Sequence, residues 1–92
     1  MTGWAVMVML NSPAEVVRVL CVDDNHDIAD STAQMLAMVG FEAVACYSGA
    51  EALAAAPAFR PHVVLTDVNM PGLSGWELAR RLRERGAPVA VI

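Results

Sequence analysis

The stretch that decides the fold runs from His62 to Gly75 and reads H-V-V-L-T-D-V-N-M-P-G-L-S-G. It begins with a short apolar run, which predicts a buried strand over residues 62–66. The run ends on an acid, Asp67, and continues into a loop rich in proline and glycine. In open parallel α/β sheets, ligands bind outside the carboxyl ends of the strands. The stretch therefore places an acidic side chain where such a sheet has its functional site.

A second apolar run, residues 17–22, also ends on acids, Asp23 and Asp24. If the two strands are neighbours in one sheet, three carboxylates converge at its edge. Like charges that close raise one another's pKa unless a cation offsets them. Mg²⁺ takes oxygen ligands of this kind, and a carboxylate can form a covalent phosphoryl intermediate. The residues predict an acidic Mg²⁺ pocket suited to phosphoryl chemistry; the alternative is that each Asp is a turn residue after a strand.

Two more strands are predicted, over residues 41–47 and 89–92. Helical patterns separate all four strands, so the order is βαβαβαβ with short connections. Alternation of this kind predicts an α/β fold in which a parallel sheet carries helices on both faces and its crossovers are right-handed.

Three helices are predicted between the strands. The first covers residues 27–39 and ends at Gly40, in the C′ position where a left-handed residue stops a helix. The second and third begin at the S-x-x-E capping boxes of Ser48 and Ser74. The second is expected to stop before Pro57. Apolar spacing predicts one inward face of the first helix, formed by Ile28, Thr32, Met35, Leu36 and Val39.

The length of 92 residues leaves room for one domain. We interpret residues 1–15 as a loosely ordered N-terminal extension and residues 16–92 as the folded part. A net charge of −4 argues against a nucleic-acid-binding surface. The apolar run at residues 4–10 is too short to span a membrane and lacks the basic start of a signal peptide, so the protein is expected to be cytoplasmic. Cys21 and Cys46 fall in predicted strands and are expected to be buried and reduced.

Several segments together resemble one family. The runs V-L-C-V-D-D-N at residues 19–25 and V-V-L-T-D-V-N-M-P-G-L-S-G at residues 63–75 are similar to the receiver domain of bacterial two-component response regulators. The G-F-E-A run from Gly40 and the S-G-A-E-A-L run from Ser48 fit as well. The resemblance covers residues 17–92 and implies a flavodoxin-like (CheY-like) three-layer fold with strand order 2-1-3-4-5.

The resemblance also implies roles for particular residues. Asp67 would be the phosphoacceptor, taking a phosphoryl group from a histidine kinase or a phosphotransfer protein. Asp24 would bind Mg²⁺ directly and Asp23 mostly through water, and Asp67 and the backbone carbonyl of Asn69 would be further ligands. Such a domain is not an enzyme in the usual sense, although it can phosphorylate itself weakly from small phosphodonors.

The chain departs from the family pattern in ways that point to a C-terminal truncation after the fourth strand. Family receivers have five strands and five helices, a Thr or Ser after the fourth strand and a Lys after the fifth. Here Ile92 is the last residue, and the sequence contains no lysine. The resemblance therefore implies impaired phosphorylation. Loss of the fifth strand and helix is expected to leave an edge open to self-association and to expose Val19, Cys21 and Val64 to water.

Two other functional hypotheses remain open. The chain could be a docking module that binds a kinase or a receiver without phosphoryl transfer, or a gene fragment with no function of its own. Three further side-chain groups are interpreted as structural. His62 opens a strand, Trp76 is expected to pack against the protein, and the arginines of residues 80–85 are expected to form a solvated helix face.

Overall fold

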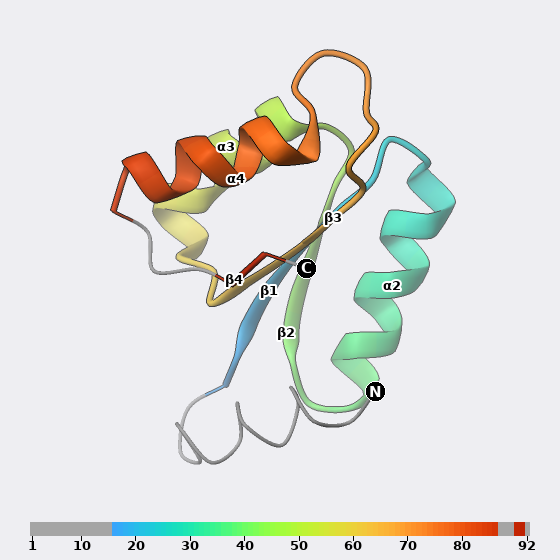
Figure 1. The fold of residues 1–92 in the computed structure, drawn as a ribbon. Helices are drawn as coiled ribbons and strands as arrows, with labels where there is room; N and C mark the ends of the chain where they lie inside the picture. The colour runs from blue at the N-terminus through green and yellow to red at the C-terminus, as the bar shows by residue number, and fades with distance from the viewer. Residues whose placement is uncertain (1–15, 87–89, 92) are drawn as a thin grey trace.

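The computed structural model describes residues 16–86 and 90–91 of the chain (Figure 1). One parallel sheet is formed by β1 (Arg18–Val22), β2 (Glu42–Cys46), β3 (Val63–Thr66) and β4 (Ala90–Val91). The strand order is β2-β1-β3-β4, which confirms the predicted order for the described strands. The predicted N-terminal extension lies outside the described residues, as do residues 89 and 92 of the fourth predicted strand. Self-association through β4 stays a prediction.

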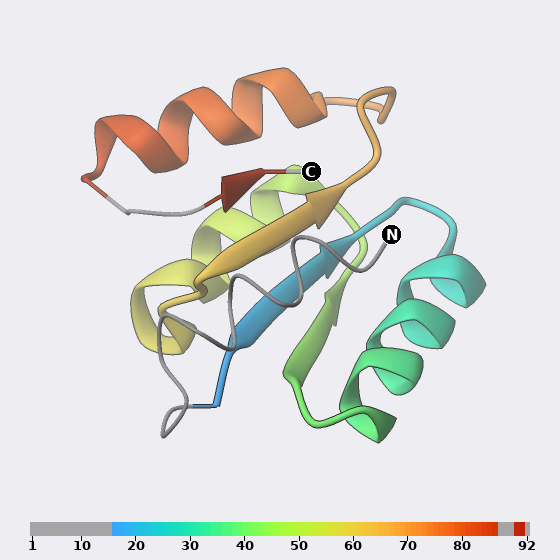
Figure 2. The same ribbon diagram turned by 60° about the horizontal axis from the view of Figure 1, so that its bottom comes forward.

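Helices cover both faces of the sheet. α2 (His26–Met38) lies on one face, and α3 (Gly49–Phe59) and α4 (Gly75–Glu84) lie together on the other (Figures 1 and 2). The predicted three-layer architecture is therefore confirmed. Within the described part of the chain, no helix combines the length and apolar character that a membrane span needs.

The alternation of side chains along the strands divides the core in two. Leu20 and Val22 of β1 face α3 and α4, where they join Val64, Leu78 and Leu82. Cys21 and the residues two and four positions before it face α2, in a cluster with Ala33 and Val63. The predicted exposure of Val19, Cys21 and Val64 is wrong, because these side chains are at most 2 % exposed. Val64 belongs to the covered face of α3 and α4, and the other two pack within the α2-side cluster.

The inward face of α2 is rotated from the predicted one. Its buried residues are Ala29 and Ala33, and Leu36 is partly buried beside them. Small side chains let the helix lie close to the sheet, whereas the prediction favoured the larger apolar residues. The prediction is wrong for three residues that are more than half exposed, namely Ile28, Met35 and Val39. The helix does end as predicted, since Gly40 has a φ of 103°.

α3 continues past the proline at which it was predicted to stop. Pro57 lies inside the helix, and the chain leaves it only at Arg60, which has a φ of 54° and donates its N–H to the Ala56 carbonyl. A proline has no N–H for the carbonyl four residues earlier, here that of Leu53. Nη1 of Arg85 donates to that carbonyl over 3.2 Å instead. An arginine at the end of α4 thus satisfies the acceptor that Pro57 leaves free.

Both predicted capping boxes begin helices, but each makes only part of the expected pattern. Ser48 Oγ accepts the Glu51 N–H, and the Glu51 carboxylate reaches back to the N–H of Tyr47. Ser74 Oγ accepts the Glu77 N–H. The Glu77 carboxylate turns along α4 instead and pairs with Arg80 and Arg81. Those hydrogen bonds, Arg80 first, lower the pKa of Glu77.

We expect a double-mutant cycle to reveal the bond between Arg85 and Leu53. Arg85→Ala should lower the free energy of unfolding by about 1 kcal/mol, because it leaves a partly buried carbonyl without its partner. In a Pro57→Ala background the new N–H of residue 57 can donate to the Leu53 carbonyl. Arg85→Ala should then lower the free energy of unfolding by less. Urea denaturation of the four proteins measures the difference. An equal cost of Arg85→Ala in both backgrounds would show that the bond does not contribute.

The buried thiols predict a loss of stability in alkali. Cys21 and Cys46 are free and buried, as expected from the sequence. Burial, and then the charge of Cys46, raise the pKa of Cys21 to about 11 from 9.0. Because the thiol ionises more readily in the unfolded chain, the folded state should lose stability as the pH rises from about 9 to 11. Chemical denaturation at several pH values should show a shallower loss in Cys21→Ala; an unchanged slope would contradict this.

Candidate functional site

The register of the two central strands brings the predicted acids together. Val22 of β1 pairs with Thr66 of β3, so the residues that follow them, Asp23 and Asp67, leave the sheet side by side. The Asp67 N–H donates to the Val22 carbonyl over 3.1 Å, which extends the pairing to the acid itself. Carboxylate oxygens of Asp23, Asp24 and Asp67 all lie within 4.8 Å of one another. The convergence expected from two strand ends is present.

A hollow of about 310 Å³ opens beside these acids, between the strand ends and the start of α2. Asp23 and Asp67 contribute to its wall, together with Thr66 at the end of β3 and Thr32 on α2. Ile28, which was predicted to face the core, lines the hollow instead. The site therefore combines carboxylates and hydroxyls with an apolar side wall, and it is open to solvent.

Backbone N–H groups fix the orientation of two of the carboxylates. Asp23 Oδ1 accepts the Asn25 N–H over 3.0 Å. Asp67 Oδ1 accepts the N–H of Asn69 over 3.1 Å, which places Asn69 in the loop next to the acid. Asn25 is also the N-cap of α2, where its side chain accepts the Ile28 N–H. The loop after β1 is thus bonded to the first turn of α2, and the loop after β3 is held by a hydrogen bond within itself.

The donor set fits a hard divalent cation. All three side chains offer carboxylate oxygens, and no Arg, Lys or His is among the described residues that line the hollow. In octahedral coordination at about 2.1 Å, opposite ligands are about 4.2 Å apart. Neighbouring ligands are only about 3.0 Å apart, and three ligands include at least two such pairs, so oxygens grouped within 4.8 Å would have to move closer or bind the ion through water. A bound Mg²⁺ would also offset the repulsion between the carboxylates.

Gly75 anchors the loop after Asp67 to the start of α4. Its N–H donates to the Val68 carbonyl over 3.0 Å. A Cβ at this position would lie 2.6 Å from the Asp67 carbonyl oxygen and 3.0 Å from the Val68 Cα. Only glycine allows the helix to approach the acid's own backbone this closely. The position of Asp67 and that of α4 are therefore linked directly.

Sequence reasoning missed a small group of side chains at the rim of the site. The Tyr47 hydroxyl donates to Asp30 Oδ1 over 2.6 Å, and this bond raises the pKa of Tyr47. The Tyr47 ring stacks on His26, with ring centroids 3.9 Å apart. His26 and Asp30 lie on one side of α2, four positions apart, and that spacing was the available signal. The group joins the loop after β2 to the helix beside the acids.

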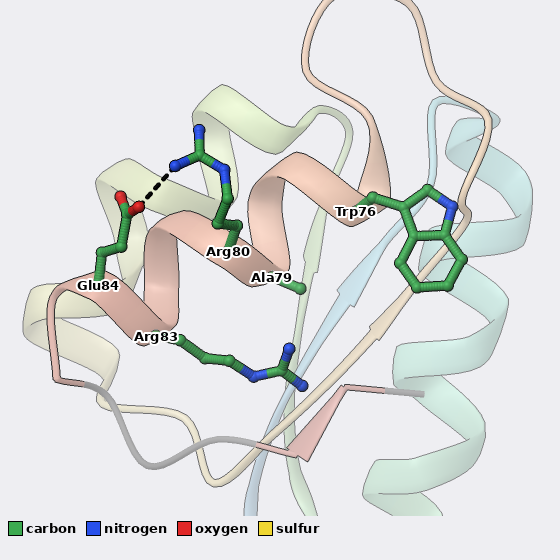
Figure 3. Close-up of a pocket in the computed structure, with 5 residues that line it drawn as sticks. All are labelled: Trp76, Ala79, Arg80, Arg83 and Glu84. Carbon is green, nitrogen blue, oxygen red and sulfur yellow. Dashed lines mark hydrogen bonds and ion pairs between the residues drawn. The ribbon is translucent and has the colours of Figure 1, made fainter.

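A second hollow, of about 400 Å³, lies along α4 and contains none of the three acids (Figure 3). Trp76, Ala79 and Arg83 line it, and Arg80 pairs with Glu84 at its edge. The prediction that Trp76 packs against the protein is wrong, because its side chain is 73 % exposed. Leu78 and Leu82 take the inward positions of the helix, which leaves the indole on the solvent side. The predicted solvated face of arginines is present on α4.

A pair of glycine substitutions should test the link between α4 and Asp67. Gly75→Ala should destabilise the fold by about 1–3 kcal/mol, because the new methyl group meets backbone that cannot move aside. Gly49→Ala is the matched control. Its Cβ would lie 2.8 Å from Cδ2 and 2.9 Å from Cβ of Leu73, so the Leu73 loop must move, but no backbone atom is that close and the cost should be smaller. Urea denaturation gives both values, and a Gly75→Ala variant as stable as the unmodified chain would contradict the close contact.

Comparison with known proteins places these features in a family. The family model for the response regulator receiver domain matches residues 19–92. The transcriptional regulatory protein PrrA of Mycobacterium tuberculosis is 40 % identical over 77 residues, 82 % of this chain and 33 % of that protein. The virulence sensor protein BvgS of Bordetella pertussis is 45 % identical over 76 residues, 79 % of this chain and 6 % of that protein. The chain thus spans about a third or less of these relatives.

Solved structures agree with the sequence matches. The chemotaxis protein CheY4 of Vibrio cholerae superposes with a TM-score of 0.76 at 34 % identity, covering 80 % of this chain and 62 % of that one. The response regulator TrrA of Thermotoga maritima, solved in complex with Mg(2+)-BeF, has a TM-score of 0.75 at 30 % identity, covering 83 % and 66 %. With the parallel sheet and the clustered acids, these matches show that the chain belongs to the response regulator receiver domain family.

Proposed function

We propose that this chain acts in phosphorelay signalling by accepting a phosphoryl group on Asp67. The observation that carries the proposal is the grouping of three carboxylates within 4.8 Å at the carboxyl ends of adjacent strands. So close a set of like charges is costly unless a cation joins it. The acids attract the cation, and the same cation can bind the oxygens of a phosphoryl group. The repulsion between the acids therefore favours binding of the substrate together with the cation.

Each residue of the site has a separate role in the proposed phosphoryl transfer. The Asn69 N–H holds Oδ1 of Asp67, and Oδ2 attacks the phosphorus atom of a phosphohistidine. An Oδ2–P bond forms, the P–N bond breaks, and its electron pair returns to the imidazole nitrogen. Asp24 and the Asn69 carbonyl would hold Mg²⁺ directly, and Asp23 would hold it through water. Bound Mg²⁺ supplies positive charge that stabilises the phosphoryl oxygens.

The proposed partner is a histidine kinase or a phosphotransfer protein. Two relatives, a transcriptional regulatory protein and a sensor protein, support a place for this domain in such a pathway. We also propose that phosphorylation of these 92 residues is inefficient. They contain no lysine, so the site receives no ammonium group to stabilise the charge that develops on the phosphoryl oxygens.

Acetyl phosphate, a small phosphodonor, tests the site assignment on the purified chain with Mg²⁺ present. The unmodified chain should gain one phosphoryl group, seen as an increase in intact mass. Asp67→Asn should gain none, because an amide is not a nucleophile for this reaction. Glu42→Gln is the control, since it removes an exposed acid at the opposite end of β2. A phosphorylated Asp67→Asn protein would overturn the assignment.

The same assay tests the metal ligands. Asp24→Asn should raise the Mg²⁺ concentration needed for half-maximal labelling about tenfold, because it removes a charged ligand. Labelling that persists in excess EDTA would contradict the Mg²⁺ dependence. Calorimetric titration of Mg²⁺ in the absence of phosphodonor separates binding of the metal from transfer of the phosphoryl group.

A second candidate function is docking without phosphoryl transfer, and the exposed indole of Trp76 favours it. Binding to a histidine kinase can be compared for Asp67→Ala and Trp76→Ala. Loss of binding only in Trp76→Ala would support docking through α4. Loss only in Asp67→Ala would support the acidic site.

A further inference from the structure

A third hollow lies at the end of the sheet opposite the acids. It measures about 470 Å³ and lies where β1 and β3 begin and where α3 and α4 end. Figure 1 shows the end of α3 leading directly into the start of β3 on this side of the sheet. Its polar wall is formed by the basic residues Arg18, Arg60, His62 and Arg85, and no acidic residue is among the described residues that line it.

The pairing of β1 with β3 fixes the imidazole of His62. The Arg18 N–H donates to His62 Nδ1 over 3.0 Å, and the His62 N–H donates to the Arg18 carbonyl over 2.8 Å. Because Nδ1 accepts a hydrogen bond, the proton of the neutral ring is on Nε2. The imidazole therefore offers one N–H donor beyond those of the guanidinium groups.

Two of the three arginines in this hollow donate to backbone carbonyls. Arg18 Nε donates to the Arg60 carbonyl over 2.8 Å, and Arg85 Nη1 donates to that of Leu53. Each bond uses one of the five N–H donors of a guanidinium group. Among residues 16–86 and 90–91, every ion pair lies on α4, between Glu77 or Glu84 and Arg80 or Arg81. Three positive charges are thus gathered here without a carboxylate to balance them.

The other side of the hollow is apolar. It is formed by Ala56, Pro57, Pro61 and Leu82. A volume near 470 Å³ lies in the usual range for small-molecule sites, in which an apolar wall holds the ligand body and a few polar groups orient it. Guanidinium groups bind phosphate oxygens in pairs, and they keep their charge at any physiological pH. The lining therefore suits an anion with a compact organic portion.

We propose that this hollow binds a small organic polyphosphate, such as a nucleoside triphosphate. The polyphosphate lies against Arg18, Arg60 and Arg85, and the organic portion lies against the two prolines. The net charge of the chain is −4, and this hollow gathers three of its six arginines, so it concentrates positive charge on a chain that is acidic as a whole. The site is separate from the acidic pocket and does not depend on phosphorylation of Asp67.

Isothermal titration calorimetry with adenosine triphosphate tests the proposal, using the full chain without Mg²⁺. Omitting the metal removes the acidic pocket from the measurement. Arg60→Asn should weaken binding about tenfold, because it removes one charge-assisted contact. Asparagine tolerates the left-handed backbone of this position. Arg83→Asn is the matched control: it removes the same charge from α4 and should leave the affinity unchanged.

Three other measurements can overturn the proposal. Equal weakening by Arg60→Asn and Arg83→Asn would mean that only net charge matters. Inorganic tripolyphosphate that binds as tightly as adenosine triphosphate would exclude a role for the apolar wall. Binding to vesicles of anionic phospholipid, with none to adenosine triphosphate, would replace the soluble ligand by a membrane surface. If Arg60→Asn does not fold, Arg18→Gln provides the same comparison from β1.

Discussion

The site depends on an electrostatic conflict that the backbone imposes. Parallel pairing of β1 and β3 brings Asp23 and Asp67 out at one edge, and the adjacent Asp24 adds a third charge within 4.8 Å. None of the described residues that line this hollow carries a positive charge. Two of the acids are oriented by backbone hydrogen bonds instead: Asp23 accepts the N–H of Asn25, and Asp67 accepts the N–H of Asn69. The cation and the phosphoryl group that we propose for this site would therefore meet carboxylates that are already oriented.

Much of this arrangement could be predicted from the sequence because it rests on local rules. Apolar runs that end on acids give both the strands and the position of Asp67 at a strand tip. Ser48 and Ser74 mark helix starts, since their side chains satisfy N–H groups that a first turn leaves free. The alternation of strands and helices predicts that the strands are parallel. The strand order, which determines which acids meet, was predicted only from the resemblance to receiver domains.

Other features could not be predicted, since they depend on contacts between distant segments. The face of α2 is set by how closely alanines let it approach the sheet, and hydrophobic spacing alone favoured Ile28 and Met35. Where α3 continues past Pro57, the carbonyl that the proline leaves free is bound by Arg85, which lies 32 residues away in the sequence. Trp76 is exposed because Leu78 and Leu82 occupy the inward positions of α4. In each case the sequence gives the type of residue, but it does not give the distant residue with which it packs or forms a bond.

The charged residues are also separated along the strands. Carboxylates gather at the carboxyl ends of β1 and β3. Arginines without an acidic partner among the described residues gather at the amino ends. The two groups lie at opposite ends of the same strands, and a five-residue strand is about 16 Å long. The sheet therefore carries a dipole of side-chain charges, with one end suited to cations and the other to anions.

The close contact at Gly75 links the acidic pocket to α4. The first residue of α4, Gly75, lies directly against the carbonyl of Asp67, and no side chain separates the helix from the backbone of the acid. A displacement of the Asp67 backbone would therefore press directly on the first turn of α4, the helix that also carries Trp76 and Arg83.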